Sequence, residues 1–117
     1  MNGHGAARDL ARLYGALPGL LPKEVLEEAA RVHSAGYDHV LLTHSQFGLG
    51  FMVHDDRAPI GVRPGSFGHA GAGGSMAFYD PDSRVGYCFA MNQMQQGLVT
   101  GGVSAMTCAE AVYGCLE

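Results

Sequence analysis

The stretch SFGHAGAGGSMAFYD, residues 66–80, joins a glycine-rich run to a run of alternating apolar residues. This pattern predicts two strands that meet around Gly73-Gly74. Asp80-Pro81-Asp82-Ser83 is a strong turn sequence, and in residues 84–92 apolar side chains recur at every second position. The centre of the chain is therefore predicted to be an antiparallel meander.

Segments with helical spacing of apolar residues flank this meander. We expect an amphipathic helix over Ala6–Leu17, ended by Pro18-Gly19, and a shorter helix over Lys23–Ala30. A closing helix is expected over Val103–Leu116. The order of these elements predicts an α+β fold, an antiparallel sheet with flanking helices.

Three segments between the first helices and the meander are less regular. Residues 33–46 show no periodicity and are predicted to be a loop with one short extended patch. In residues 47–53, bulky side chains alternate with Gly48 and Gly50, which predicts a strand with a bare face under a closely packed neighbour. The prolines and glycines of residues 55–65 predict a surface loop.

Composition excludes several classes of protein. The formal net charge of −4 and the single lysine, Lys23, leave no basic patch, so we expect no nucleic-acid partner. There is no transmembrane stretch and no signal peptide, and we therefore expect a cytoplasmic location by default. Hydrophobic residues make up 47% of the chain and charged residues 15%, which indicates apolar faces intended for a partner segment.

The sequence contains no complete copy of the common phosphate-binding, nucleophile or metal-binding motifs. The glycines between the two predicted strands lack the lysine of a phosphate loop and the helix of a dinucleotide fold. Ser75 resembles a nucleophile elbow, but Ala77 replaces its last glycine and the segment runs from strand to strand. The three cysteines are interpreted as free thiols, and no spacing of the six histidines fixes a zinc site. We predict no metal and no cofactor, and keep a histidine-dependent metal protein as a weaker hypothesis.

One candidate site remains, on the strand that carries His69, Ala70 and Gly71. Small side chains from Ala70 to Gly74 would let a bound acyl group lie close to the backbone, where an N–H stabilises a developing oxyanion. His69 at the rim would hydrogen-bond to a substrate carboxylate or to an active-site hydroxyl. The alternative, a glycine-rich strand packed under a helix, stays open on pattern alone.

The runs FGLGF (residues 47–51) and FGHAGAGGSMAFYDPDSRVGYCFAMNQM (residues 67–94) resemble the C-terminal part of the serine beta-lactamase-like hydrolases. That group includes class C beta-lactamases, penicillin-binding proteins and related esterases. His69-Ala70-Gly71 is similar to the Lys-Thr-Gly-type triad of the family, in which many esterase-like members have His first. The resemblance implies that His69 orients substrate or the catalytic hydroxyl, that the Ala72 N–H forms half of the oxyanion hole, and that His69, Ala70 and Gly71 contact substrate. Ala70 departs from the usual hydroxyl residue, which weakens the expected binding of a substrate carboxylate.

The family's Ser-x-x-Lys nucleophile and Tyr-x-Asn element do not occur in these residues. We therefore expect residues 1–117 to be a single partial domain that belongs to a hydrolase of ester or amide bonds (in a beta-lactam, a D-peptide or a carboxylic ester), inactive alone. The alternative is a non-catalytic remnant that binds a partner or persists as a folded module. In either case we expect low stability, self-association or a complementing chain.

Overall fold

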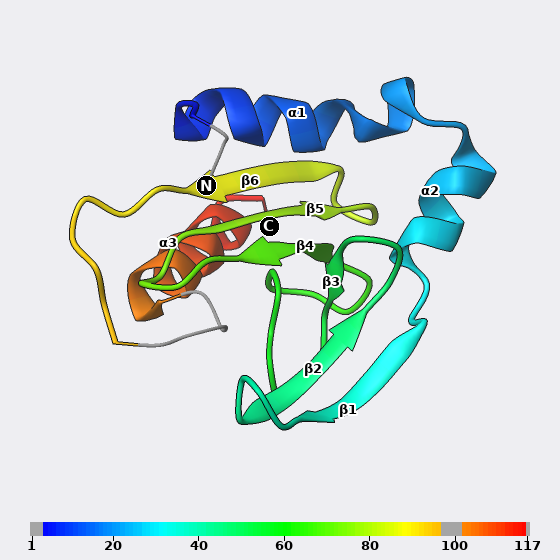
Figure 1. Ribbon diagram of the computed structural model, residues 1–117. Helices are drawn as coiled ribbons and strands as arrows, with labels where there is room; N and C mark the ends of the chain where they lie inside the picture. Colours follow the sequence, from blue (N-terminus) through cyan, green and yellow to red (C-terminus); the bar gives the residue numbers. More distant parts are fainter. Residues whose placement is uncertain (1–3, 97–101, 117) are drawn as a thin grey trace.

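The computed structural model describes residues 4–96 and 102–116 (Figure 1). Its helices are α1 (Ala7–Leu20), α2 (Lys23–Ala30) and α3 (Val103–Gly114). Its strands are β1 (Ser34–Asp38), β2 (Thr43–Phe47), β3 (Met52–Val53), β4 (Phe67–Ala70), β5 (Met76–Asp80) and β6 (Val85–Phe89).

The strands form one antiparallel six-stranded sheet whose order follows the chain from β1 to β6. β4 pairs with β5 from Phe67 opposite Tyr79 to Ala70 opposite Met76, and β5 pairs in turn with β6. Residues 71–75 and 81–84 form the two turns between these strands. The predicted central meander, its two turns and the α+β class are confirmed.

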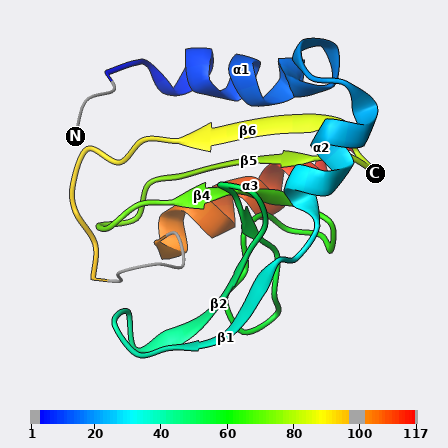
Figure 2. The ribbon, with the colours of Figure 1, turned by 45° about the vertical axis from the view of Figure 1, so that its right-hand side comes forward.

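Two successive residues of β6 place α1 and α3 on opposite faces of the sheet. A Cβ added at Gly86 would overlap the carbonyl oxygen of Ala11 and the backbone of Gly15, so the sheet meets α1 closely there. The Tyr87 hydroxyl instead donates to the carbonyl oxygen of Ala105 on α3, at 2.9 Å. Because neighbouring strand residues point to opposite faces, the two helices enclose the sheet. Figure 2 shows α1 along β6 and α3 behind the central strands.

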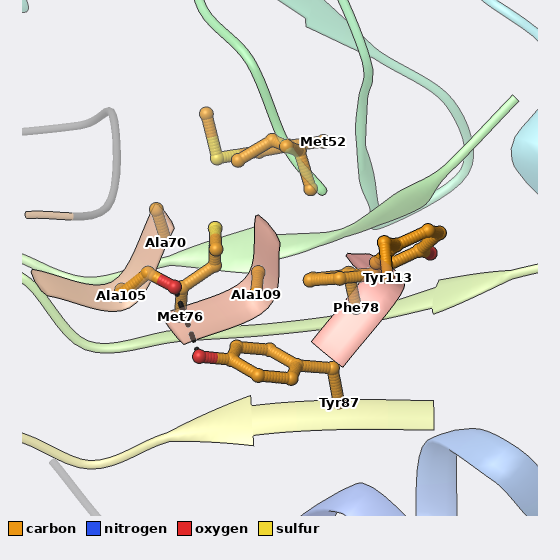
Figure 3. Close-up of a cluster of buried hydrophobic side chains, with 9 residues drawn as sticks. Met52, Ala70, Met76, Phe78, Tyr87, Ala105, Ala109 and Tyr113 are labelled. Carbon is orange, nitrogen blue, oxygen red and sulfur yellow. Dashed lines mark hydrogen bonds between the residues drawn. The ribbon is translucent and has the colours of Figure 1, made fainter. Parts of the chain in front are cut away.

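The hydrophobic core lies between the sheet and α3 (Figure 3). The rings of Phe78 and Tyr87 stack across β5 and β6 with centroids 5.0 Å apart. Full burial of a side chain such as Phe78 contributes roughly 1.5–3 kcal/mol. The cluster consists of Met52, Ile60, Ala70, Met76, Phe78, Tyr87, Ala105, Ala109 and Tyr113.

A buried carboxylate ties the end of α3 to the end of β5. Asp80 is fully buried and accepts a hydrogen bond from the Tyr113 hydroxyl at 2.6 Å. Its other oxygen accepts from the backbone N–H groups of Asp82 and Ser83 in the following turn. Burial by itself would raise the pKa of the Asp80 carboxyl, but the hydrogen bonds from Tyr113 and Ser83 hold that pKa below its usual value.

The predicted end of the first helix is wrong. α1 continues through Pro18 to Leu20, and the Leu21 N–H closes it by donating to the carbonyl oxygen of Leu17 at 3.0 Å. Pro18 lies in the last turns, where its missing N–H removes one helical hydrogen bond near the end. The second helix begins after Pro22 and covers the predicted residues.

The predicted loop over residues 33–46 is also wrong, because these residues form the β1–β2 hairpin. The two strands pair over five residues each, from Ser34 opposite Phe47 to Asp38 opposite Thr43. The Asp38 carboxylate accepts from the N–H groups of Val40 and Leu41 and so caps the turn. β1 is almost wholly exposed, so it lacks the apolar alternation by which a half-buried strand is recognised.

The single strand predicted over residues 47–53 is divided between β2 and β3 by a tight turn. The Gly48 N–H donates to the Phe51 carbonyl oxygen at 2.8 Å, and Gly50 has a φ of +85°. The expectation of a close neighbour is confirmed, since a Cβ at Gly48 would overlap the carbonyl oxygen of Ala29.

The 55–65 segment is a loop, as predicted, but it is not confined to the surface, because Ile60 is fully buried in the core cluster and Ala58 is also buried. The 55–65 segment forms no named strand or helix, and the closing helix ends two residues before Leu116. The sequence also predicts an irregular stretch over residues 93–102, which lies partly outside the described residues. Within the part of the chain that the structure describes, no helix has the length and apolar character needed to span a membrane.

Replacement of Gly86 by Ala is expected to lower the free energy of unfolding by about 1–3 kcal/mol, because the added methyl group overlaps the α1 backbone. Urea denaturation of the 117-residue chain, followed by circular dichroism, measures this change. Gly19→Ala is the matched control, because a Cβ at Gly19 meets nothing within 4 Å. Equal losses in the two variants would contradict the proposed close contact.

Tyr113→Phe is expected to cost roughly 1.5–3 kcal/mol at neutral pH, the usual range for a hydrogen bond to a charged group. The native pKa of Asp80 is lowered, so its stabilising effect is present above the unfolded pKa and is lost as pH falls through the native pKa. The difference between the variant and the parent chain should therefore narrow on acidification. Tyr37→Phe, on the exposed β1, is the control and should show no such pH dependence.

Candidate active-site edge

The predicted site residues lie where β4 ends. His69 pairs with Ala77 and Ala70 with Met76 on β5. On its other side, β4 pairs with β3 only at Phe67 and Gly68. Beyond Gly68, therefore, the outer edge of β4 has no strand partner among the described residues.

The backbone N–H and C=O groups of successive residues at this edge point alternately towards β5 and away from it. The Gly71 N–H donates to the Ser75 carbonyl oxygen at 2.8 Å and so faces β5. The neighbouring Ala70 directs its backbone groups to the open edge, as expected from strand alternation. Ala72 is exposed, and none of the described residues accepts a hydrogen bond from its N–H. A backbone donor that has no acceptor among the described residues thus belongs to an exposed residue just beyond the end of β4.

Glycines shape the turn that holds this donor. A Cβ at Gly71 would overlap the Ser75 hydroxyl oxygen, so the two residues pack against each other directly. Gly73 and Gly74 have φ values of +90° and +107°, a region that L-residues with side chains rarely adopt. Ser75 therefore lies in a strand-to-strand turn, as expected, and not on a strand-to-helix elbow.

The structure separates the side chains of His69 and Ala70. His69 is exposed, and its Nδ1 lies 2.6 Å from the carbonyl oxygen of Ala70. The Ala70 side chain is buried in the core on the α3 side. The edge thus brings together the imidazole of His69 and the backbone of Gly71 and Ala72, while the methyl group of Ala70 stabilises the core.

A cavity of about 580 Å³ lies beside His69, between the first half of α1 and the sheet. Most of its wall is apolar, and Asp9 is the only lining residue, among those described, with a formal charge at neutral pH. Its lining residues are His4, Gly5, Ala6, Ala7, Asp9, Leu10, Leu13, Tyr14, His69, Ser75, Met76, Ala77, Cys88, Phe89 and Ala90.

Two ionisable groups in this wall are kept neutral. Burial raises the pKa of the Tyr14 hydroxyl, and the neighbouring Cys88 raises it further. Burial also raises the pKa of the Cys88 thiol. Desolvation therefore disfavours charge within the cavity, and its wall suits neutral groups.

The described residues offer no metal centre, since no three His, Cys, Asp or Glu side chains gather closely enough to bind an ion. The arrangement instead offers hydrogen bonds: a backbone donor at Ala72 and an imidazole at His69. The weaker hypothesis of a histidine-dependent metal protein gains no support from these positions.

Sequence reasoning missed that Phe47 and one face of α1 lie next to this edge. The Phe47 ring lies 6.3 Å from the His69 ring, centroid to centroid, because β2 and β3 bring it next to β4. Leu10, Leu13 and Tyr14 of α1 line the cavity. The helical spacing on α1 indicated an apolar face, but no local signal indicated what that face lies against.

Comparison with known proteins is consistent with this geometry. A family model described as Beta-lactamase matches residues 1–102. The chain is 35% identical over 108 residues to the esterase/beta-lactamase LipL of Mycobacterium tuberculosis (strain ATCC 25618 / H37Rv), covering 84% of this chain and 24% of that protein.

Three solved structures share the fold. A family VIII carboxylesterase is 31% identical with a TM-score of 0.84, over 95% of this chain and 32% of its own. EstA from Arthrobacter nitroguajacolicus Rue61a is 28% identical with a TM-score of 0.83, over 94% and 32%. A novel penicillin-binding protein homolog from Caulobacter crescentus is 34% identical with a TM-score of 0.88, over 97% and 32%.

The antiparallel sheet and its helices therefore define a beta-lactamase/transpeptidase-like fold. The chain belongs to the beta-lactamase family. It spans about a quarter of the length of LipL and about a third of the length of the matched solved chains. The resemblance that residues 67–94 predicted is confirmed.

Gly71→Ala is expected to force the Ser75 side chain out of its position and to destabilise the chain by about 1 kcal/mol, the low end of overpacking costs. Ser75→Ala removes the overlapping oxygen, so the double variant should recover at least about 0.5 kcal/mol by a double-mutant cycle. Urea denaturation measures the four free energies of unfolding. Strict additivity would show that Gly71 and Ser75 do not pack as described.

Proposed function

We propose that these residues form the oxyanion-binding edge of a serine hydrolase that cleaves ester or amide bonds through an acyl-serine intermediate. The observation that carries the proposal is the exposed Ala72 N–H beside His69 at the open end of β4, in a chain of the beta-lactamase family. Relatives named as an esterase/beta-lactamase and as a carboxylesterase support the reaction class.

In the proposed reaction, the substrate carbonyl lies along the outer edge of β4. Attack on the carbonyl carbon places negative charge on its oxygen, and the Ala72 N–H donates a hydrogen bond to that oxyanion. One such donor contributes roughly 3 kcal/mol of transition-state stabilisation. Gly71 is proposed to contact the substrate through its backbone, and His69 hydrogen-bonds to the substrate or to the catalytic hydroxyl. Ala70 contributes its outward-facing backbone to the same edge.

The nucleophile and its base are proposed to lie outside these residues. None of the serines is followed three residues later by a lysine, and none of the tyrosines is followed two residues later by an asparagine. Acyl-serine chemistry requires the nucleophile, the base and the oxyanion donors together. Residues 1–117 are accordingly proposed to be a partial domain of the hydrolase, and small-molecule esters or amides are its proposed substrates.

The 117-residue chain is expected not to hydrolyse p-nitrophenyl acetate faster than its His69→Ala variant, and not to bind a fluorophosphonate probe covalently. Release of p-nitrophenolate, followed by its absorbance, and intact-mass spectrometry of the chain after exposure to the probe would test this. Covalent labelling of Ser75 would overturn the proposal, because it would place the nucleophile within these residues.

The complete protein from its source cells gives the complementary test. It is captured with an antibody against residues 103–117, weighed by mass spectrometry and assayed with the same ester and probe. We expect a product heavier than 12.3 kDa that contains Ser-x-x-Lys. The His69→Ala substitution is expected to lower its turnover of the ester and to leave its folding unchanged. A 12.3 kDa product without turnover would instead support the non-catalytic binding module.

A further inference from the structure

The N–H group proposed to bind the oxyanion lies in a turn that contains two conformationally permissive glycines. The Gly74 N–H donates to the carbonyl oxygen of Gly71 at 3.1 Å, and Gly73 has a φ of +90°, as the third residue of a type II turn requires. Ala72 is the second residue, and the hydrogen bond of the turn does not use its N–H. Because Gly73 and Gly74 rotate more freely than residues with side chains, the direction of the Ala72 N–H depends on what holds these two peptides.

Two hydrogen bonds reach this turn from residues that follow β6. The Gln95 N–H donates to the carbonyl oxygen of Gly73 at 2.9 Å. The Gly102 N–H donates to the carbonyl oxygen of Gly74 at 3.4 Å. A Cβ at Gly73 would also overlap the methyl group of Met94, so the segment after β6 lies directly against the turn, as Figures 1 and 2 show. Each permissive glycine therefore has its carbonyl oxygen held by a donor from outside the turn.

The side chain of Gln95 joins the turn to α3. Its Nε2 donates to the Ser104 hydroxyl oxygen at 2.5 Å, and its Oε1 lies where a Cβ at Gly102 would stand. Gly102 is the N-cap residue of α3, and Ser104 lies in the first turn of that helix. The same end of α3 is fixed to the sheet, because the Tyr87 hydroxyl donates to the carbonyl oxygen of Ala105. Gln95 thus connects the turn to a helix end that β6 holds in place.

We propose that Gln95 is a positioning residue for oxyanion binding. Its N–H holds the carbonyl oxygen of Gly73, and its side chain is held in turn by Ser104. Together these bonds keep the Ala72 N–H in the direction that oxyanion binding requires. Gln95 does not touch the substrate and acts only through the turn. Its effect on turnover rests on the proposed function, whereas its effect on the conformation of the turn does not.

The conformation of the turn is tested on the 117-residue chain labelled with ¹⁵N-alanine, in which Ala72→Ser assigns the Ala72 amide signal by its loss. Gln95→Ala keeps the backbone N–H but removes the bridge to Ser104. We expect the Ala72 signal of this variant to shift and to show exchange broadening in relaxation-dispersion spectra. Gln95→Glu should restore a signal close to that of the parent chain, since a carboxylate accepts a hydrogen bond from the Ser104 hydroxyl.

Gln93→Ala is the matched control, because Gln93 is exposed on the same segment and its side chain makes no hydrogen bond with the described residues. An unchanged Ala72 signal in a folded Gln95→Ala variant would refute the positioning role, as would an equal change in the control. Ser104→Ala removes the same bridge from the side of the helix, so it tests the role even if Gln95→Ala does not fold. If Ser104→Ala leaves the Ala72 signal at its parent position, the proposal is wrong.

The effect on turnover is tested on the complete protein with p-nitrophenyl butyrate. We expect Gln95→Ala to lower kcat about tenfold with KM unchanged, because a misdirected donor weakens an interaction made in the transition state, and full loss of such a donor costs roughly 10²–10³ in kcat. Gln95→Glu should recover most of this loss, and Gln93→Ala should match the parent protein.

The two proposals fail in different ways. An unchanged kcat in Gln95→Ala, or a raised KM with kcat unchanged, would refute the role of Gln95 in oxyanion binding. If the parent protein does not hydrolyse the ester while Gln95→Ala still shifts the Ala72 signal, the proposed function is wrong, and the role of Gln95 in holding the turn stands.

Discussion

β6 contacts α1 on one face of the sheet and α3 on the other, and these two contacts hold the layers of the fold together. Gly86 has no side chain, so the α1 backbone lies directly on the strand. The next residue, Tyr87, points the other way and donates its hydroxyl proton to the carbonyl oxygen of Ala105 on α3. Because adjacent strand residues point to opposite faces of the sheet, Gly86 contacts a helix on one face and Tyr87 contacts a helix on the other. The hydrophobic core cluster lies on the face that α3 covers.

The candidate site follows from how the strands pair around β4. Pairing with β5 fixes the register that places His69 opposite Ala77 and buries the side chain of Ala70. The shortness of β3 leaves the end of β4 open on its other side. An edge with free backbone donors is normally a liability for a sheet, and here it is short and lies beside a histidine. The pairing of β4 with β5 thus stabilises the sheet, and the short pairing of β4 with β3 leaves the Ala72 N–H without a strand partner.

The proposed role of this edge in acyl transfer depends on the relation to the beta-lactamase family. An N–H donor and an imidazole do not by themselves cleave a bond, because acyl transfer also needs an activated nucleophile. The relatives matched are about three to four times longer than the matched segment, and they include an esterase/beta-lactamase, a carboxylesterase and a penicillin-binding protein homolog.

Much of the architecture was predictable from local pattern. The β4–β5–β6 meander, α2, most of α3 and the position of His69 at a strand end followed from alternation, helical spacing and turn residues, which act over a few neighbouring positions. The family resemblance of residues 67–94 also came from the sequence, since the motif is contiguous.

The rest of the fold and the surroundings of His69 depend on contacts between elements that are far apart in the sequence. The β1–β2 hairpin is formed by backbone pairing between largely exposed strands, which leaves no apolar alternation in the sequence. The contact of Phe47 with His69 and the cavity beneath α1 join residues that are distant along the chain. Such contacts depend on how whole elements pack, and not on the preferences of neighbouring residues, so only the folded chain reveals them.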